Sequence, residues 1–419
     1  MLTRAPRSGG LSPPNGAGPH SLTRKASMTP SPASLRANWN YPTSVRFGTG
    51  RIAELADCCK AAGIARPLLV TDPGLAGSAM VREAVAANEK AGLPTAVFSE
   101  LKSNPVAQNV TDGIAAFRRG RHDGVIGFGG GSALDTGKVI AFMQGQTRPI
   151  WDFEDIGDWW TRADPKGIAP VIAVATTAGT GSEVGRSGVI TDEATHTKKI
   201  IFHPKMMPVI VIIDPALMVG LPPHLTAATG MDALAHNLEA YLAPAYHPMA
   251  DGIGLEGIRL IKEFLPRAVA DGKDLEARAQ MAVAASMGAT AFQKGLGAIH
   301  SLSHPVGALY DAHHGLTNAV FMPYVLAFNR PAIAEKAARI ARYLGLARAD
   351  LTGLIDWVLE LRQTIGIPHT LGGLKVGPER FAEMAEMAAV DPTASSNPVK
   401  VGPAELRRLY EDALEGRLA

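Results

Sequence analysis

The sequence contains little cysteine and no long apolar run. Its 2 cysteines among 419 residues, Cys58 and Cys59, are neighbours, which excludes a framework of spaced disulfides. Such cysteine usage is typical of a reducing compartment, so we expect a cytoplasmic protein with two free thiols on a helix. No apolar run approaches the roughly 18 residues that a membrane-spanning helix needs, so we expect no membrane partner.

An excess of charge of one sign is also lacking. The formal net charge is +2, from 41 basic and 39 acidic residues. Because the folded part carries no basic run, the sequence predicts no binding to nucleic acid. The content of 46% hydrophobic and 19% charged residues is ordinary for a globular protein, and a chain of this length can form two domains.

Acidic residues are missing altogether from residues 1–38, which are rich in Pro, Ser and Gly and carry several Arg. Such a segment has little apolar surface to bury, and we predict a disordered basic tail. Two other interpretations stay open: an Arg- and Ser-rich transit peptide, and translation that starts at Met28. The many prolines oppose the amphipathic helix of a transit peptide, so we favour a tail or a later start.

Residues 39–215 alternate short apolar runs with helical patterns. Continuous apolar strands separated by helices are typical of a parallel sheet covered on both faces. We expect strands at 66–71, 95–98, 124–128, 168–176 and 209–213.

The pattern changes after Pro215. Apolar residues then recur at helical spacing, and strand-like runs nearly vanish. We expect helices that cover 228–241, 253–271, 275–288, 333–344 and 354–366. The sequence therefore predicts an α/β domain over 39–215 and an all-helical domain over 216–419, with a ligand bound between them near the carboxyl ends of the strands.

A glycine-rich loop, GGGSALDTGK at 129–138, follows the third expected strand and opens a helix. Its glycines let the backbone approach a bulky anion, and the unpaired N–H groups of a helix start attract phosphate. The spacing matches neither the dinucleotide fingerprint nor a Walker loop. A tight strand-to-helix turn would use the same glycines, but we favour phosphate binding.

A second loop, TTAGTGSE at 176–183, also follows an apolar strand, and its hydroxyls suit contact with a ribose or nicotinamide. Two such loops at the carboxyl ends of strands in one sheet reinforce each other. Asp72 ends the first expected strand. An acidic residue there binds the ribose 2′-OH of NAD and repels the 2′-phosphate of NADP; the alternative is a turn aspartate before proline.

Residues suited to metal binding cluster in the second half. Asp232 and His236 lie four apart in a helical pattern, which puts both side chains on one face and lets them converge on one ion. A carboxylate with imidazoles and no thiolate suits Fe²⁺, Zn²⁺ or Mn²⁺. Any single histidine is more often a packed or surface residue, but four of the 12 lie close together further on: His300, His304, His313 and His314.

These motifs resemble those of the iron-containing (group III) alcohol dehydrogenases. The loops at 129–138 and 176–184, the segment TAATGMDALAHNLEAY at 226–241 and the segment GLGAIHSLSHPVGALYDAHHG at 295–315 occur in the family order. The late segment DPTASSNPVK at 391–400 also matches. The resemblance extends from about residue 40 to the C-terminus. It implies an N-terminal Rossmann-like dinucleotide-binding α/β domain and a helical metal-binding domain, the dehydroquinate synthase-like fold, in a homodimer or larger homo-oligomer.

The resemblance also assigns roles to residues. It implies that the metal ligands are Asp232, His236, His300 and His314, and that His304 takes part in catalysis. His314 is chosen over His313 on spacing alone. Lys138 is expected to support the glycine loop. The implied cofactor contacts are Asp72, Asn104, Gly130, Gly131, Ser132, Asp135, Thr176, Thr177, Thr180 and Lys199.

The implied reaction is reversible hydride transfer between a small primary alcohol and its aldehyde, with NAD rather than NADP, and with Fe²⁺, Zn²⁺ or Mn²⁺ as the cation. His304 is the candidate relay for the hydroxyl proton, with packing or a hydrogen bond to a ligand as its alternative role. Arg186 and Lys294 favour a substrate with an anionic tail, such as 4-hydroxybutyrate, unless both are solvated or ion-paired elsewhere.

Two other functions stay open at this point. One is a metal-dependent, NAD-using cyclase or lyase of the dehydroquinate synthase type, which shares the glycine loop but has a different ligand pattern. The other is a non-catalytic cofactor-binding protein. The complete set Asp232, His236, His300 and His314 argues against both.

Overall fold

The computed structural model describes residues 37–39 and 43–418. Residues 1–36 of the predicted tail therefore lie outside the described residues. Ala37 and Asn38 do not fit the prediction of disorder, because they lie in strand β1 (Ala37–Trp39), whose backbone pairs antiparallel with the next strand.

The first half of the chain forms a seven-stranded sheet of order β1-β2-β9-β6-β5-β3-β4. Every pair except β1–β2 is parallel, and all five predicted strands are present. Four of them are buried along their whole length, which explains their continuous apolar sequences. The strands after β1 are β2 (Ser44–Phe47), β3 (Pro67–Thr71), β4 (Ala96–Phe98), β5 (Gly124–Gly129), β6 (Val171–Ala175) and β9 (Ile210–Ile213).

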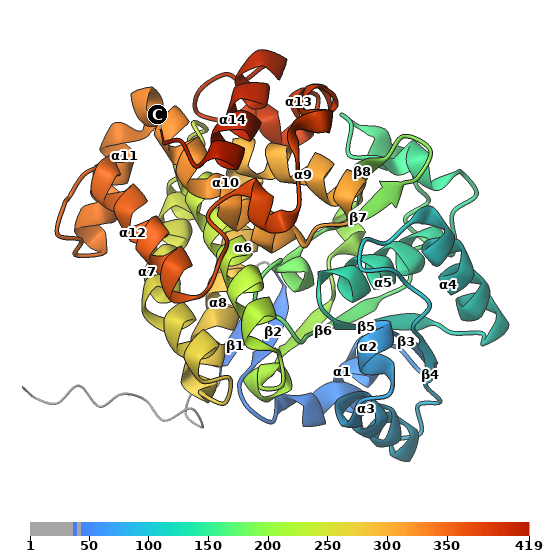
Figure 1. Ribbon diagram of the computed structural model, residues 1–419. Coiled ribbons are helices and arrows are strands. Elements are labelled where there is room, and N and C mark those ends of the chain that lie inside the picture. Colours follow the sequence, from blue (N-terminus) through green and yellow to red (C-terminus); the bar gives the residue numbers. More distant parts are fainter. Residues whose placement is uncertain (1–36, 40–42, 419) are drawn as a thin grey trace, which may run out of the picture.

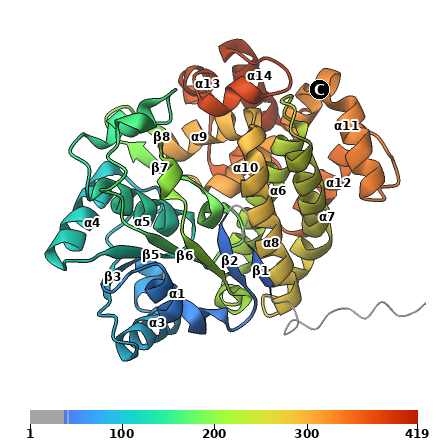
Figure 2. The same cartoon turned by 180° about the vertical axis from the view of Figure 1, so that it is seen from behind.

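Helices cover both faces of this sheet (Figures 1 and 2). Alternate strand residues feed two separate cores: Leu68 and Val70 pack with one pair of helices, and Leu69 packs with the other. The first pair is α4 (Ala107–Arg119) and α5 (Gly131–Met143), and the second is α1 (Leu55–Ala61) and α3 (Ala79–Lys90). The short helix α2 (Pro73–Ala76) lies between α1 and α3 in the sequence.

The two cysteines lie buried on α1, as expected for free thiols on a helix. Burial raises the pKa of Cys59 to about 12, so its thiolate, the reactive form, is scarce at neutral pH.

An antiparallel hairpin, β7 (Ser187–Asp192) and β8 (Thr197–Phe202), extends from the sheet domain toward the helical half. The sequence analysis did not predict it. In β8 every residue but one is only partly buried, so its sequence TKKIIF lacks a clear apolar alternation.

The second half is helical, and no strand follows Ile213 within the described residues. Side chains from Thr226 to Leu242 are almost all buried in the first helix, which packs against its neighbours on several sides. A helix that is buried on all sides lies in the middle of its domain. The helices are α6 (Pro223–Leu242), α7 (Pro248–Ala270), α8 (Leu275–Ala291), α9 (Ala298–Tyr310), α10 (His314–Phe328), α11 (Arg330–Tyr343), α12 (Leu351–Thr364), α13 (Phe381–Ala389) and α14 (Pro403–Glu415).

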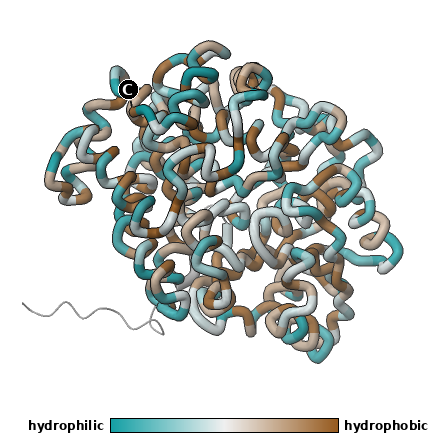
Figure 3. The backbone as a smooth tube through the Cα atoms, in the orientation of Figure 1, coloured by the Kyte–Doolittle hydropathy of each residue, from teal (hydrophilic) through white to brown (hydrophobic). Residues whose placement is uncertain are grey.

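Hydrophobic residues collect inside both halves and polar residues on the outside (Figure 3). Among the helices of the described residues, none combines the length and apolar character needed to cross a bilayer. The fold is thus a Rossmann-like sheet domain joined to a helical domain, and the strand ends that carry both predicted loops face the helical half.

Candidate metal centre and cofactor site

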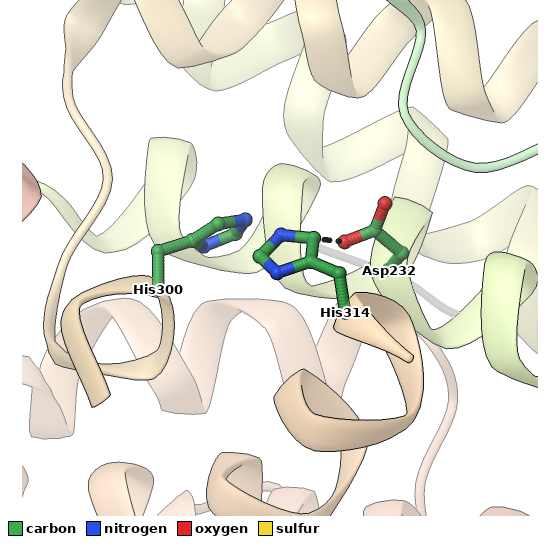
Figure 4. A group of neighbouring side chains, drawn as sticks. All are labelled: Asp232, His300 and His314. Carbon is green, nitrogen blue, oxygen red and sulfur yellow. Dashed lines mark ion pairs between the residues drawn. The ribbon is translucent and has the colours of Figure 1, made fainter. Parts of the chain in front are cut away.

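Three of the predicted ligands meet where α6, α9 and α10 come together. Asp232 on α6, His300 on α9 and His314 on α10 offer ligand atoms that all lie within 4.8 Å of one another. Figure 4 shows the two imidazoles and the carboxylate clustered between their helices. Asp232 and His300 are buried, whereas the side chain of His314 is 25% exposed, so the group has one open side.

His236 lies beside this group. It follows Asp232 by one turn of α6, and its Nε2 lies 3.9 Å from Asp232 Oδ1. Its ring stacks on that of His300, with the centroids 4.8 Å apart. His313 is the N-cap residue of α10 and is exposed. The structure therefore brings His314, rather than His313, to Asp232.

A close helix contact makes this convergence possible. Gly315 follows His314 and faces α6, where a Cβ atom on it would lie 2.3 Å from the Ala228 carbonyl oxygen and 2.8 Å from Asp232 Cβ. Only glycine lets the start of α10 approach the α6 backbone this closely. Next to this contact, His314 Nε2 lies 3.6 Å from Asp232 Oδ1.

Burial controls the protonation of two of the imidazoles. It lowers the pKa of His236 to about 4, although the Asp232 carboxylate opposes the shift. Burial, together with the charge of Lys198, places the pKa of His314 well below its usual range. Both rings are thus neutral near pH 7, the form in which histidine binds a metal.

His300 is held differently. Its Nδ1 lies 2.5 Å from Glu239 Oε2, and Glu239 Oε1 also accepts a hydrogen bond from the Ile299 backbone at 2.8 Å. Burial alone would lower the pKa of His300, but the Glu239 carboxylate outweighs it and raises that pKa. Because Nδ1 points at the carboxylate, Nε2 is the nitrogen left for a cation, as in carboxylate–histidine–metal arrangements.

The sequence analysis missed one residue of this cluster, Asn318. Its Nδ2 lies 2.8 Å from Asp232 Oδ1 and 3.2 Å from the Nε2 atoms of both His300 and His314. It follows His314 by four residues on α10, a spacing that places both on one helix face. The same spacing had identified Asp232 with His236, so the signal was available.

His304 lies next to the ligand group without belonging to it. Its ring stacks on His314 at a centroid distance of 5.3 Å, and its Nδ1 lies 2.6 Å from Asp391 Oδ2. Burial tends to raise the pKa of Asp391, but the His304 ring and hydrogen bonds from Thr393 outweigh it and bring that pKa to about 2. Asp391 is therefore ionised at neutral pH.

The predicted phosphate loop lies at the end of β5, with Gly130 as the N-cap residue of α5. Asp72, at the end of β3, accepts a hydrogen bond from the Gly130 backbone at 3.2 Å. A Cβ atom on Gly131 would lie 2.7 Å from the Thr180 side chain, so glycine is needed where the two loops touch. The first-turn N–H groups of α5 lack partners within the helix and suit an anion.

Other predicted cofactor residues join this group. Thr177 flanks Gly130, and the Thr176 backbone donates a hydrogen bond to Gly129 at 3.0 Å. Ser132 Oγ donates to the Ser103 carbonyl at 2.5 Å. The next residue, Asn104, donates a hydrogen bond to Asp311 at the end of α9 and so links the two halves.

Asp135 and Lys138 face inward from α5. Asp135 accepts hydrogen bonds from Ser182 Oγ and, at 3.0 Å, from the Val189 backbone. Lys138 lies 3.2 Å from Asp135 and donates at 2.9 Å to the Ser182 carbonyl. The pair ties the second loop and β7 to α5, which is support for the cofactor loops rather than an exposed contact surface.

The structure does not bring Lys199 to this group. Its ammonium pairs with Asp192 at 3.0 Å and lies 5.0 Å from the Trp151 ring centroid. Neighbouring residues of a strand face opposite sides, so Lys198 points the other way, toward Gly307 on α9. Burial lowers the pKa of Lys198, while Asp232 and Asp311 oppose the shift. Lys198 is therefore the lysine of β8 that faces the metal group.

The two basic residues considered for an anionic substrate differ in their surroundings. The side chain of Lys294 is 0% exposed and is bound to Asp251 and, at 3.0 Å, to the Tyr241 carbonyl. It is ion-paired, so this part of the expectation fails. Arg186 is partly exposed and donates to Gln293 Oε1 across the two halves at 3.2 Å. The residue before Gln293 is Phe292, whose ring lies 5.1 Å from that of His236.

The donor set fits a divalent cation. One carboxylate and three imidazoles, of which His236 and His314 are neutral near pH 7, meet in a largely buried cluster, and such donors suit first-row divalent metals. The glycine loop lies at the carboxyl end of β5, next to the helical half that holds this cluster. Fold and site together define the class of metal-dependent dehydrogenases with a dinucleotide-binding sheet domain.

Comparison with known proteins agrees with this class. Residues 42–215 match the family described as iron-containing alcohol dehydrogenase, and residues 226–414 match its C-terminal family. A 4-hydroxybutyrate dehydrogenase of Cupriavidus necator is 40% identical over 385 residues, which cover 89% of this chain and 99% of that protein. This chain belongs to the iron-containing alcohol dehydrogenase family and is a metal-dependent alcohol dehydrogenase.

Solved structures support the same conclusion. A 1,3-propanediol oxidoreductase is 38% identical, with a TM-score of 0.84 over 88% of this chain and 97% of that one. A sulfoacetaldehyde reductase from Bifidobacterium kashiwanohense, solved in complex with NAD⁺, is 28% identical, with a TM-score of 0.80 over 90% of this chain and 98% of that one.

The contact at Gly315 yields a testable prediction. Gly315→Ala places a methyl group against the backbone of α6, so α10 must shift and carry His314 away from Asp232. We expect less bound metal per chain by elemental analysis, and a loss of about 1–3 kcal/mol in unfolding free energy from overpacking. Gly252→Ala on α7 is the control, because its Cβ meets nothing within 4 Å. Full metal content in Gly315→Ala would show that the contact does not set the site.

Proposed function

We propose that the protein is an NAD-linked, iron-dependent dehydrogenase of small primary alcohols, with the four ligands Asp232, His236, His300 and His314. The observation that carries the proposal is the convergence of Asp232, His300 and His314 within 4.8 Å. Fe²⁺ is the cation we expect, and Zn²⁺ or Mn²⁺ suits the same donors.

When bound, the cation would supply Lewis acidity at the oxygen of the alcohol or aldehyde. The residues of the chain then have separate tasks. His304 receives and returns the hydroxyl proton, and the loops around Gly130 and Thr177 would hold the cofactor, which would accept or supply the hydride. Lys198, whose ammonium lies beside Gly307 on α9, adds positive charge near the ligand group.

Substitution of two histidines separates metal binding from proton transfer. His300→Ala removes a ligand, so we expect metal content and activity to fall together. His304→Ala removes no ligand, so we expect full metal content with kcat lower by about 100-fold or more. Elemental analysis and the absorbance of NADH at 340 nm measure the two effects.

The reference for His300→Ala and His304→Ala is the native protein from which a chelator has removed the metal. We expect no turnover without metal and recovery when Fe²⁺ is added back. Normal activity in the metal-free protein would contradict the proposed function, and normal activity in His304→Ala would contradict only the proton relay.

The same site supports NAD over NADP. Asp72 lies against the glycine loop, where its charge would repel a 2′-phosphate. Burial raises the pKa of Asp72, while hydrogen bonds from Gly130 and from its own backbone oppose the shift.

Asp72→Asn keeps a hydrogen-bond acceptor for Gly130 and removes the charge. We expect the ratio of kcat/KM with NADP to that with NAD to rise by about tenfold or more, the effect of roughly 1.4 kcal/mol of lost repulsion. Steady-state kinetics with both cofactors measure it, and Asp57→Asn, an exposed residue of α1, is the control. An unchanged ratio of the two kcat/KM values would show that residues other than Asp72 discriminate between NAD and NADP.

For the substrate, we propose an alcohol with an anionic tail, such as 4-hydroxybutyrate. Arg186 supports this, because it is partly exposed and reaches Gln293 beside the ligand helices, while Lys294 is committed to Asp251. The similarity to a 4-hydroxybutyrate dehydrogenase supports it too. The similarity to a 1,3-propanediol oxidoreductase favours a neutral substrate instead.

Arg186→Gln distinguishes these substrates. We expect KM for 4-hydroxybutyrate to rise about tenfold, as the loss of one charge-assisted hydrogen bond predicts, with little change for 1-butanol. Arg348→Gln is the control, because that side chain is 56% exposed on the helical half. A native enzyme that prefers 1,3-propanediol or propanol to 4-hydroxybutyrate would refute the anionic tail.

We also propose a cytoplasmic homodimer or larger homo-oligomer, with a small-molecule substrate as its other partner. Free, buried Cys58 and Cys59 support a reducing compartment. The oligomer rests on the family resemblance.

A further inference from the structure

The late segment that follows α13 has no role in the mechanism given so far. It runs from Asp391 through a short 3₁₀ turn, η11 (Pro392–Ser396), to Asn397. It packs against α9, the helix that carries His300 and His304. Its polar side chains contact that helix at two points.

The first contact is with the start of α9. Asn397 Oδ1 accepts a hydrogen bond from the Ala298 backbone at 3.1 Å and another from Asn329 Nδ2 at 2.9 Å. Asn397 Nδ2 donates back to Asn329 Oδ1 at 2.8 Å. An N–H group of a helix start has no partner within the helix, so this buried amide pair fixes where α9 begins.

The second contact is with His304 itself. Asp391 Oδ2 lies 2.6 Å from His304 Nδ1. The other carboxylate oxygen, Oδ1, accepts hydrogen bonds from the Thr393 backbone at 2.9 Å and from its hydroxyl at 2.5 Å. Hydrogen bonds within its own turn therefore hold the carboxylate through Oδ1, and Oδ2 is the oxygen that binds the imidazole.

This geometry selects one tautomer. A carboxylate only accepts hydrogen bonds, so the His304 nitrogen that faces it must carry the proton. The proton is then on Nδ1, and Nε2 is the basic nitrogen of the neutral ring. The ring lies against His314 and 6.1 Å from the His300 centroid, so this base is placed beside the ligand group.

We propose that Asp391 is a positioning residue, which holds His304 in the tautomer with a free Nε2 and so prepares it to accept the substrate's hydroxyl proton. This inference rests on the proposed role of His304 as proton relay. Asp391 touches neither substrate nor cofactor in this mechanism; it acts through the imidazole. The simpler role, a cap that only closes the η11 turn, predicts native kcat in Asp391→Asn, because an asparagine side chain also accepts the hydrogen bonds within such a turn.

Asp391→Asn is the direct test, with Ser395→Ala in the same turn as its matched control. An amide can donate to Nδ1 as well as accept from it, so the ring is released to the other tautomer. We expect kcat to fall about 10- to 100-fold, with KM, metal content and melting temperature close to native. Ser395→Ala removes the hydrogen bond from Ser395 Oγ to the Pro392 carbonyl within the same turn and leaves Asp391 bound to His304, so we expect near-native kcat.

The double variant Asp391→Asn/His304→Ala tests the route of the effect. If Asp391 acts only through His304, the double variant has the same kcat as His304→Ala alone, because non-additivity marks residues that work as a unit. A further drop by the full Asp391→Asn factor would overturn the proposal, as would native kcat in Asp391→Asn. Native kcat in His304→Ala would instead refute the proton relay.

The tautomer of His304 can also be measured in the native protein, without a variant of Asp391. In zinc-loaded protein labelled with ¹⁵N-histidine, ring nitrogen shifts report which nitrogen carries the proton, and His304→Ala assigns the signal. We expect the proton on Nδ1. A proton on Nε2 in the metal-loaded protein would overturn the proposal.

Discussion

The close packing of α10 on α6 is the constraint on which the site depends. Gly315 lets the start of α10 lie against the Ala228 carbonyl, and this brings His314 to Asp232. The ligand group also needs α9, which carries His300. Three helices must therefore be positioned so that their ligand atoms can reach one ion. Helices in a packed core hold such positions, whereas a surface loop would not.

Burial gives this cluster its chemistry. Removing water disfavours charged imidazoles, so His236 and His314 stay neutral and able to bind metal. Two rings are held by carboxylates instead: Glu239 holds His300, and Asp391 holds His304. His300 and His304 therefore share the same kind of partner at Nδ1, and they differ in position, because His300 lies in the group with Asp232 and His314 and His304 lies beside that group.

Much of the fold was predictable because its signals are local. The five predicted strands and five predicted helical windows are all present, since each carries an apolar pattern within its own sequence. Strands β1, β2, β7 and β8 were missed, because their sequences are partly polar and contain no continuous apolar run. The loops around Gly130 and Thr177 were expected to lie together, because parallel strands in one sheet bring their carboxyl ends to the same edge.

The sequence by itself predicted most of the element types, the two loops at strand ends and, with the family resemblance, a candidate ligand set. Only the tertiary structure decided between residues that the sequence leaves equivalent. The pleat of β8 turns Lys198 toward the metal group and Lys199 toward Asp192, and Lys294 is buried against Asp251. Asp391 reaches His304 across 87 residues of sequence. Such pairings depend on how distant elements pack, and periodicity within one element carries no information about them.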